Sequence, residues 1–130
     1  MKPTRLMACT LVSSILALPV AAQAADADWK RGRVYYRMVC TACHTKTPAG
    51  AVAPNARTKV EWTAYIQANK HAKGKDTVTF YVSKQYRDQI KATNKAAAKF
   101  ADVAEADLLN DVRAFMLRGA RDGDEPASCN

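Results

Sequence analysis

The sequence predicts an all-α protein, and three observations carry this prediction. Apolar and small residues recur at spacings of three and four over residues 26–43 and 104–118, which is the period of one helix face. Thr58 and Glu61 form a capping box, the pattern that begins a helix. Residues 77–91 alternate partly like a strand, but a lone strand has no partner, so we interpret them as helix. We therefore expect a small fold of about 4–5 helices.

The first helix is expected over residues 26–43, and a loop follows over residues 45–57. One stripe of this helix is made by Trp29, Gly32, Tyr36, Cys40 and Cys43. A glycine inside a helix costs about 1 kcal/mol relative to alanine, so Gly32 indicates the close approach of a second helix. The loop is marked by Pro48, Gly50 and Pro54, because these residue types interrupt regular structure.

The remaining elements follow from their apolar faces and breaks. The helix after Thr58 carries Trp62, Tyr65 and Ile66 on one face. Residues 69–76 are polar and contain Gly74, so they form a break, whereas residues 92–101 are rich in Ala and Lys and show no clear boundary. The last helix, residues 104–118, has an apolar face and ends before Gly119. That face is made by Leu108, Leu109, Val112, Phe115 and Met116.

Residues 1–24 read as a secretory signal peptide of bacterial type. Lys2 and Arg5 precede a mostly apolar run over residues 6–20, and Ala-Gln-Ala at residues 22–24 is a cleavage site. The run is too short and poorly flanked for a permanent membrane span. We therefore expect export to the periplasm, a single domain over residues 25–121, and a polar tail over residues 122–130.

The motif Cys-x-x-Cys-His at residues 40–44 is the attachment motif for c-type haem. On a helix, positions i, i+3 and i+4 share one face. Cys40 and Cys43 can therefore form thioethers along one haem edge, while His44 binds the iron as the proximal ligand. A backbone carbonyl of the following loop, with Pro54 as the candidate, would accept the second N–H of this imidazole. The cofactor expected is one covalent haem c.

Other interpretations of the two cysteines are a thioredoxin-like pair, half of a zinc site, or a disulfide hairpin. No βαβ pattern supports the first, and His71 and Cys129 are too isolated to complete a zinc site. If haem takes Cys40 and Cys43, Cys129 is left over in the polar tail. It then forms an intermolecular disulfide or tether, or is an incidental tail residue.

The charge of the chain indicates the kind of partner. The formal net charge of +8 becomes +6 once the signal peptide, with Lys2 and Arg5, is removed. A basic surface suits docking to an acidic redox protein, where charge mainly raises the association rate. Nucleic acid is not expected as a partner of an exported chain that has no aromatic–basic pattern.

These landmarks together resemble the monohaem class I cytochrome c family, over roughly residues 28–119. Gly32 and Tyr36 hold the places of a glycine and an aromatic residue eight and four residues before the first haem cysteine. Phe115 is similar to the aromatic residue of the family's last helix, which crosses the first helix at the glycine. Pro54 is similar to the loop proline whose carbonyl holds the proximal histidine. The resemblance implies a cytochrome c-like fold built around one haem.

One departure from the family concerns the sixth iron ligand. The family usually supplies a methionine shortly before its last helix, but Ala97 stands at that place. The distal candidates are His71 and Met116, with Met38, Lys95 and Lys99 as weaker alternatives, or the position is open. A six-coordinate site suits single-electron transfer between redox partners, without enzyme activity of its own. An open site would instead bind gas or peroxide.

Overall fold

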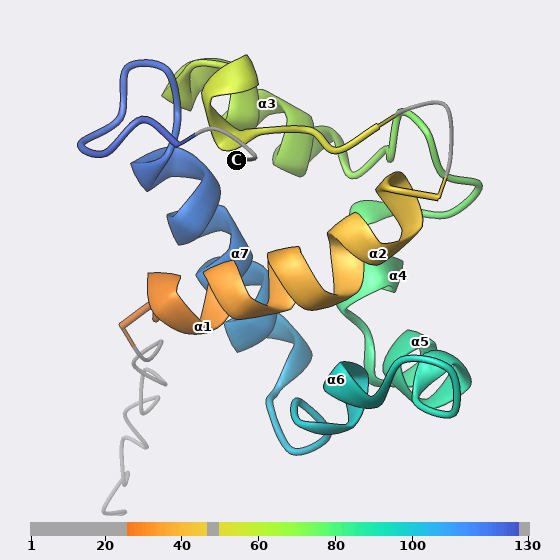
Figure 1. Ribbon diagram of the computed structural model, residues 1–130. Helices are drawn as coiled ribbons and strands as arrows, with labels where there is room; N and C mark the ends of the chain where they lie inside the picture. Colours follow the sequence, from red (N-terminus) through yellow and green to blue (C-terminus); the bar gives the residue numbers. More distant parts are fainter. Residues whose placement is uncertain (1–25, 47–49, 128–130) are drawn as a thin grey trace, which may run out of the picture.

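The computed structural model describes residues 26–46 and 50–127, and this part of the chain contains helices and loops but no strand (Figure 1). The all-α prediction is therefore confirmed. The expected signal peptide, residues 1–24, and Cys129 lie outside the described residues. The helices are α1 (Trp29–Tyr35), η1 (Tyr36–Cys40), α2 (Thr41–His44), η2 (Pro54–Ala56), α3 (Lys59–Ala68), α4 (Val78–Val82), α5 (Lys84–Ile90), α6 (Lys95–Ala98) and α7 (Glu105–Arg118).

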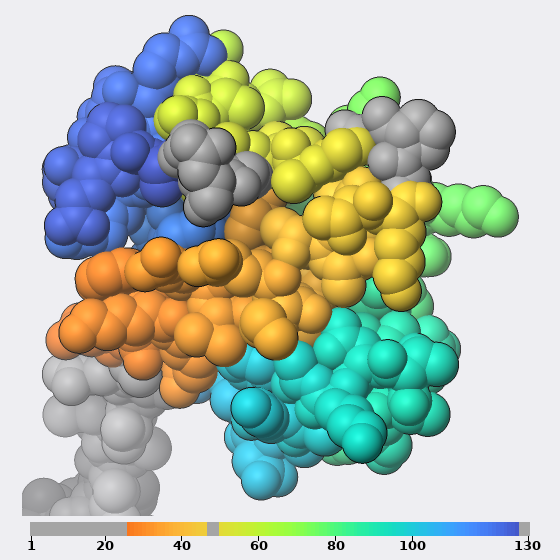
Figure 2. Space-filling view, viewed as in Figure 1, coloured from red at the N-terminus to blue at the C-terminus, as the bar shows by residue number. Residues whose placement is uncertain are grey.

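The first three helices form one continuous helical segment that ends at the Cys-x-x-Cys-His motif. Asp28 caps its start, because the Asp28 carboxylate accepts the backbone N–H groups of Lys30 and Arg31 at 2.9 and 3.1 Å. In η1 the helix widens into a π-helical turn, and the Thr41 N–H bonds to the Tyr36 carbonyl five residues earlier. In the space-filling view this helix forms a band across the molecule, with α5 and α6 on one side of it (Figure 2).

Helices α1 and α7 cross at Gly32, where the sequence predicted the close approach of a second helix. A Cβ atom on Gly32 would lie 2.0 Å from the Asp111 carbonyl oxygen and 2.8 Å from the Val112 nitrogen. The buried carboxylate of Asp111 accepts the Asp28 N–H at 2.7 Å and also the Nε–H of Arg31. Figure 1 shows the crossing of α1 and α7. It is fixed by close backbone approach and by the Asp111 carboxylate, which joins α7 to the start of α1.

The start of helix α3 is set by a capping box and its end by a left-handed residue. The capping box is present, since Thr58 Oγ1 accepts the Glu61 N–H at 3.3 Å and the Glu61 carboxylate accepts the Thr58 N–H at 2.7 Å. Asn69 ends the helix in the left-handed conformation, with φ 51°. Helix α3 packs against α7, which places Trp62 in the core.

The segment expected as one helix over residues 77–91 is two helices. Ser83 adopts an extended conformation between α4 and α5, and its hydroxyl accepts the Tyr86 N–H at 3.1 Å, so it caps α5. Asn94 caps the short α6 in the same way. The prediction of about 4–5 helices therefore counted too few segments in the described chain, because these two caps each start a new helix.

The core lies between α7 and the elements around it. The Tyr35 ring is fully buried, meets Phe100 edge-on with centroids 4.9 Å apart, and donates its hydroxyl to the Tyr81 carbonyl at 2.7 Å. The guanidinium of Arg87 is buried and donates to the carbonyls of Ser83, Phe100 and Val103. None of the helices in the described ranges is long and apolar enough to cross a membrane.

Candidate functional site

The two motif cysteines lie at the end of the first helix, on the wall of a cavity. Cys40 closes η1 and Cys43 lies one turn later in α2, and both are free thiols. Cys40 is partly buried, and this burial raises the pKa of its thiol to about 12. Cys43 is exposed. Cys40 therefore lies inside the cavity and Cys43 at its edge.

The imidazole of His44 is oriented by the loop that follows it. Nδ1 of His44 lies 3.2 Å from the Gly50 carbonyl oxygen. Because a carbonyl only accepts, Nδ1 is the donor in this contact, and in a neutral imidazole the lone pair is then on Nε2. This is the tautomer that a metal-binding histidine needs.

The acceptor was expected to be Pro54, and the structure gives this role to Gly50 instead. The Pro54 carbonyl accepts the indole N–H of Trp62 at 2.6 Å. A buried indole N–H needs an acceptor, and the adjacent Pro54 carbonyl meets that need. Pro54 is buried beside Gly119 at the end of α7 and does not line the cavity at the motif.

The cavity beside the motif has a volume of about 230 Å³ and mostly apolar walls. Val39, Val82, Val112 and Tyr86 are among its lining residues, together with Cys40, Cys43 and His44. Arg57 also lines it, with its guanidinium 5.5 Å above the Trp62 ring and 5.2 Å above the Tyr65 ring. The site thus combines two thiols, an oriented imidazole, a mostly apolar wall and the cationic side chains of Arg57 and Lys73.

Both distal candidates from the sequence line this cavity. His71, on the loop between α3 and α4, has its ring centroid 5.6 Å from that of His44. Burial lowers the pKa of His71, and the nearby His44 lowers it further. Met116 is almost fully buried on α7. Of the weaker alternatives, Met38 is exposed, and Met38, Lys95 and Lys99 do not line the cavity.

Ala97, the residue at the place of the family's methionine, is fully buried but does not line the cavity. It belongs to the same apolar core as Phe100 and Tyr35. Residues that the sequence did not single out include Arg57, Asp111 and Tyr81. Two signals could have identified the first two: a lone arginine shortly before an aromatic-rich helix, and an aspartate inside an apolar helix face.

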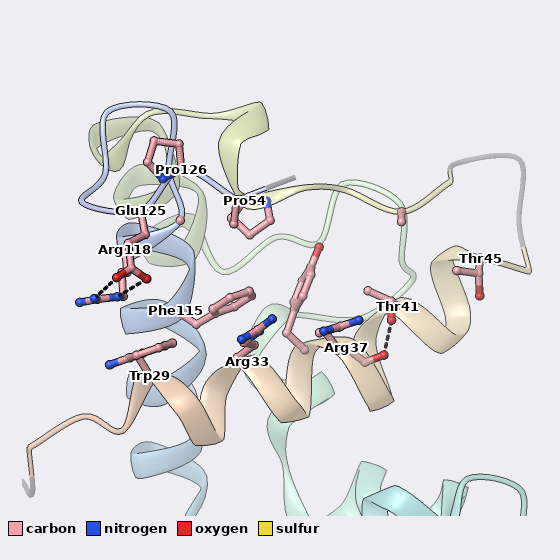
Figure 3. Close-up of a pocket in the computed structure, with 14 residues that line it drawn as sticks. Trp29, Arg33, Arg37, Thr41, Thr45, Pro54, Phe115, Arg118, Glu125 and Pro126 are labelled. Atoms are coloured by element: carbon pink, nitrogen blue, oxygen red, sulfur yellow. Dashed lines mark hydrogen bonds and ion pairs between the residues drawn. The ribbon is translucent and has the colours of Figure 1, made fainter. Parts of the chain in front are cut away.

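A second hollow, of about 450 Å³, lies near the ends of α1 and α7 (Figure 3). Trp29, Arg33 and Arg37 project toward it from the first helix, and Phe115 from α7. It is larger than the cavity at the motif, but Cys40, Cys43 and His44 do not line it. Its rim holds the ion pair between Arg118 and Glu125, 2.6 Å apart. The residues of the Cys-x-x-Cys-His motif therefore belong to the smaller cavity.

Over the described residues, no group of three or more His, Cys, Asp or Glu side chains is arranged to hold a metal ion. A haem iron needs fewer protein ligands than a free metal ion, because one or two axial side chains complete its coordination. The cavity offers such side chains in His44, His71 and Met116. Comparisons with protein-family models, curated proteins and solved structures find no match to this chain.

Proposed function

We propose that this protein is an exported monohaem c-type cytochrome that transfers single electrons between redox partners. One observation carries the proposal. An apolar cavity is lined by Cys40, Cys43 and His44, and the Gly50 carbonyl orients the His44 ring through Nδ1. The signal peptide predicted over residues 1–24 supports export to the periplasm, where bacteria attach haem to this motif.

The chain would hold the haem by three side chains. Cys40 and Cys43 would form the two thioethers, and Nε2 of His44 would bind the iron. When bound, the haem supplies reversible one-electron chemistry. Two cationic side chains, Arg57 and Lys73, line the cavity. The Arg57 guanidinium would pair with a haem carboxylate, because its planar N–H groups bind a carboxylate through two hydrogen bonds.

The residues around the motif keep the site dry and rigid. Val39, Val82 and Val112 line the cavity with apolar surface, and the Gly50 carbonyl fixes the orientation of the His44 ring. A fixed ligand and a dry pocket reduce the rearrangement that accompanies a change of charge. No bond in a substrate has to form or break, so the protein is proposed as a carrier, free or as a subunit of a redox complex, and not as an enzyme.

A basic surface supports docking to an acidic redox partner. The chain without residues 1–24 carries a formal net charge of +6, and Lys70, Lys73 and Lys75 are exposed on the loop that also carries His71. Exposed charges of one sign raise the association rate with a partner of opposite sign, and salt screens the effect.

The proposal is tested by expressing the full chain in a bacterium that attaches haem in its periplasm. We expect periplasmic protein whose mass includes one haem that survives denaturation. Cys40→Ser and Cys43→Ser should each lose a thioether, whereas the matched control Cys129→Ser should keep full haem content. Wild-type protein without covalent haem would refute the proposal.

The second candidate function is the binding of gas or peroxide at an open iron site. It is favoured by Ala97, which is buried away from the cavity at the place of the family's methionine. Rapid binding of carbon monoxide by the reduced wild-type protein would support this alternative over electron transfer.

A further inference from the structure

We infer that His71, and not Met116, is the sixth ligand, so that two imidazoles close the iron site. The inference rests on the proposed haem at Cys40 and Cys43 and concerns a different part of the same cavity. It selects between the two functions above, because a strong sixth ligand excludes gas and peroxide from the iron.

The first argument is the separation of the two histidine rings. Their centroids lie 5.6 Å apart with the planes tilted by 55°, and both rings line the same cavity. A metal bound by two imidazoles on opposite sides, with bonds of about 2 Å each, needs ring centroids about 6 Å apart. The observed spacing is therefore within a small loop movement of what such a site requires.

The second argument is that the loop carrying His71 is fixed on both sides of that residue. The Asn69 side chain donates to Thr79 Oγ1 at 3.0 Å and accepts the Thr79 N–H at 2.9 Å, which joins the end of α3 to the start of α4. The Tyr65 hydroxyl accepts the Ala72 N–H at 3.0 Å. These contacts hold the loop over the cavity before any ligand is bound.

The third argument is the close packing around the His71 ring. The Tyr81 ring lies against it, with centroids 4.9 Å apart. Gly74 permits this approach, since a Cβ there would lie 2.5 Å from the Tyr81 hydroxyl and 2.9 Å from His71 Nδ1. The Tyr81 ring and the close Gly74 backbone fix the orientation of the His71 imidazole. A histidine that binds nothing would not require this.

One contact must change when His71 binds iron. The Lys73 N–H lies 3.3 Å from His71 Nδ1, a long hydrogen bond that requires the proton on Nε2. An imidazole that binds iron through Nε2 carries its proton on Nδ1. Ligation therefore replaces this contact, and the loss is small because the bond is long and exposed.

Met116 has a sufficient role without a metal. It is 3% exposed and belongs to the apolar core together with Val112 and Phe115 on the same face of α7. Its position follows from helix packing, whereas His71 is a half-buried polar side chain held on a loop over the cavity.

The test compares His71→Ala with the control Met116→Leu in haem-loaded protein. Visible and electron paramagnetic resonance spectra report the spin state, and carbon monoxide binding reports an open position. We expect wild type and Met116→Leu to be low-spin and resistant to carbon monoxide. His71→Ala should become high-spin and bind carbon monoxide, and added imidazole should restore its low-spin spectrum, which a merely structural role of His71 would not explain.

A second variant keeps the test decisive if His71→Ala folds poorly. His71→Met should remain six-coordinate and shift the midpoint potential upward, because methionine–histidine ligation raises the potential. A low-spin, carbon monoxide-resistant His71→Ala protein with haem attached would overturn the inference and leave the cytochrome proposal intact. Absence of covalent haem in the wild type would instead overturn the cytochrome proposal.

Discussion

The contact at Gly32 gives a prediction in which two physical effects have opposite signs. Helix propensity alone says that Gly32→Ala stabilises the protein by about 1 kcal/mol. The structure says the reverse, because the new Cβ would lie 2.0 Å from the Asp111 carbonyl oxygen, whereas ordinary contacts begin near 3.4 Å. Helices α1 and α7 would therefore have to separate by about 1.4 Å at this point.

The cost can be estimated from the interactions that this separation strains. Overpacking of a close interface costs about 1–3 kcal/mol. Separation also weakens the bonds of the buried Asp111 carboxylate to the Asp28 N–H and to Arg31, and hydrogen bonds to a charged group contribute about 1.5–3 kcal/mol each. After subtracting the propensity gain, we expect a net loss of about 3 kcal/mol, against a total stability of about 5–15 kcal/mol for a small domain.

The assay is urea unfolding of the purified full chain, followed by far-ultraviolet circular dichroism. Val34→Ala is the matched control, since Val34 lies on the same helix with 48% of its surface exposed, and its change should stay within about 0.5 kcal/mol. A Gly32→Ala protein that is as stable as wild type, or more stable, would refute the close-contact argument, because only propensity would then be acting.

Two further predictions concern buried groups. In the haem-free chain at pH 8, Cys43 should react with iodoacetamide much faster than Cys40, because a pKa of about 12 leaves only about one Cys40 thiol in ten thousand ionised. Peptide mass spectrometry measures both rates, and equal rates would mean that the cavity does not form without haem. Arg87→Met should lower the free energy of unfolding by about 2–4 kcal/mol, because three carbonyls lose their donor. An unchanged urea midpoint would show that the Arg87 guanidinium contributes nothing net.

The elements that sequence reasoning predicted correctly are those set by local signals. The capping box at Thr58 and Glu61 fixes the start of α3 through bonds three residues apart. The glycine at position 32 predicted a close helix contact, since a glycine inside a helix otherwise only costs stability. In both cases the information lies within a few neighbouring residues, so it can be read before the fold is known.

The elements that were missed depend on tertiary contacts. Ser83 is compatible with a helix interior or with a cap, and only packing on either side decides that it breaks residues 77–91. The acceptor for His44 was assigned to Pro54 on sequence position, but the buried indole of Trp62 occupies that carbonyl. The approach of His71 to His44 likewise depends on the pairing of Asn69 with Thr79, which lies outside any local pattern.

The π-helical turn η1 determines how the first helix serves two surfaces at once. Eight residues separate Gly32, which faces α7, from Cys40, which faces the cavity. Eight α-helical steps of about 100° would leave the two positions about 80° apart around the axis. A wider turn rotates less per residue, so η1 reduces that angle and turns the thiol back toward the side of α7. The length of the segment, more than the identity of its exposed residues, therefore keeps Gly32 directed toward α7 while Cys40 is directed toward the cavity. A single-residue deletion there would change the direction of one relative to the other.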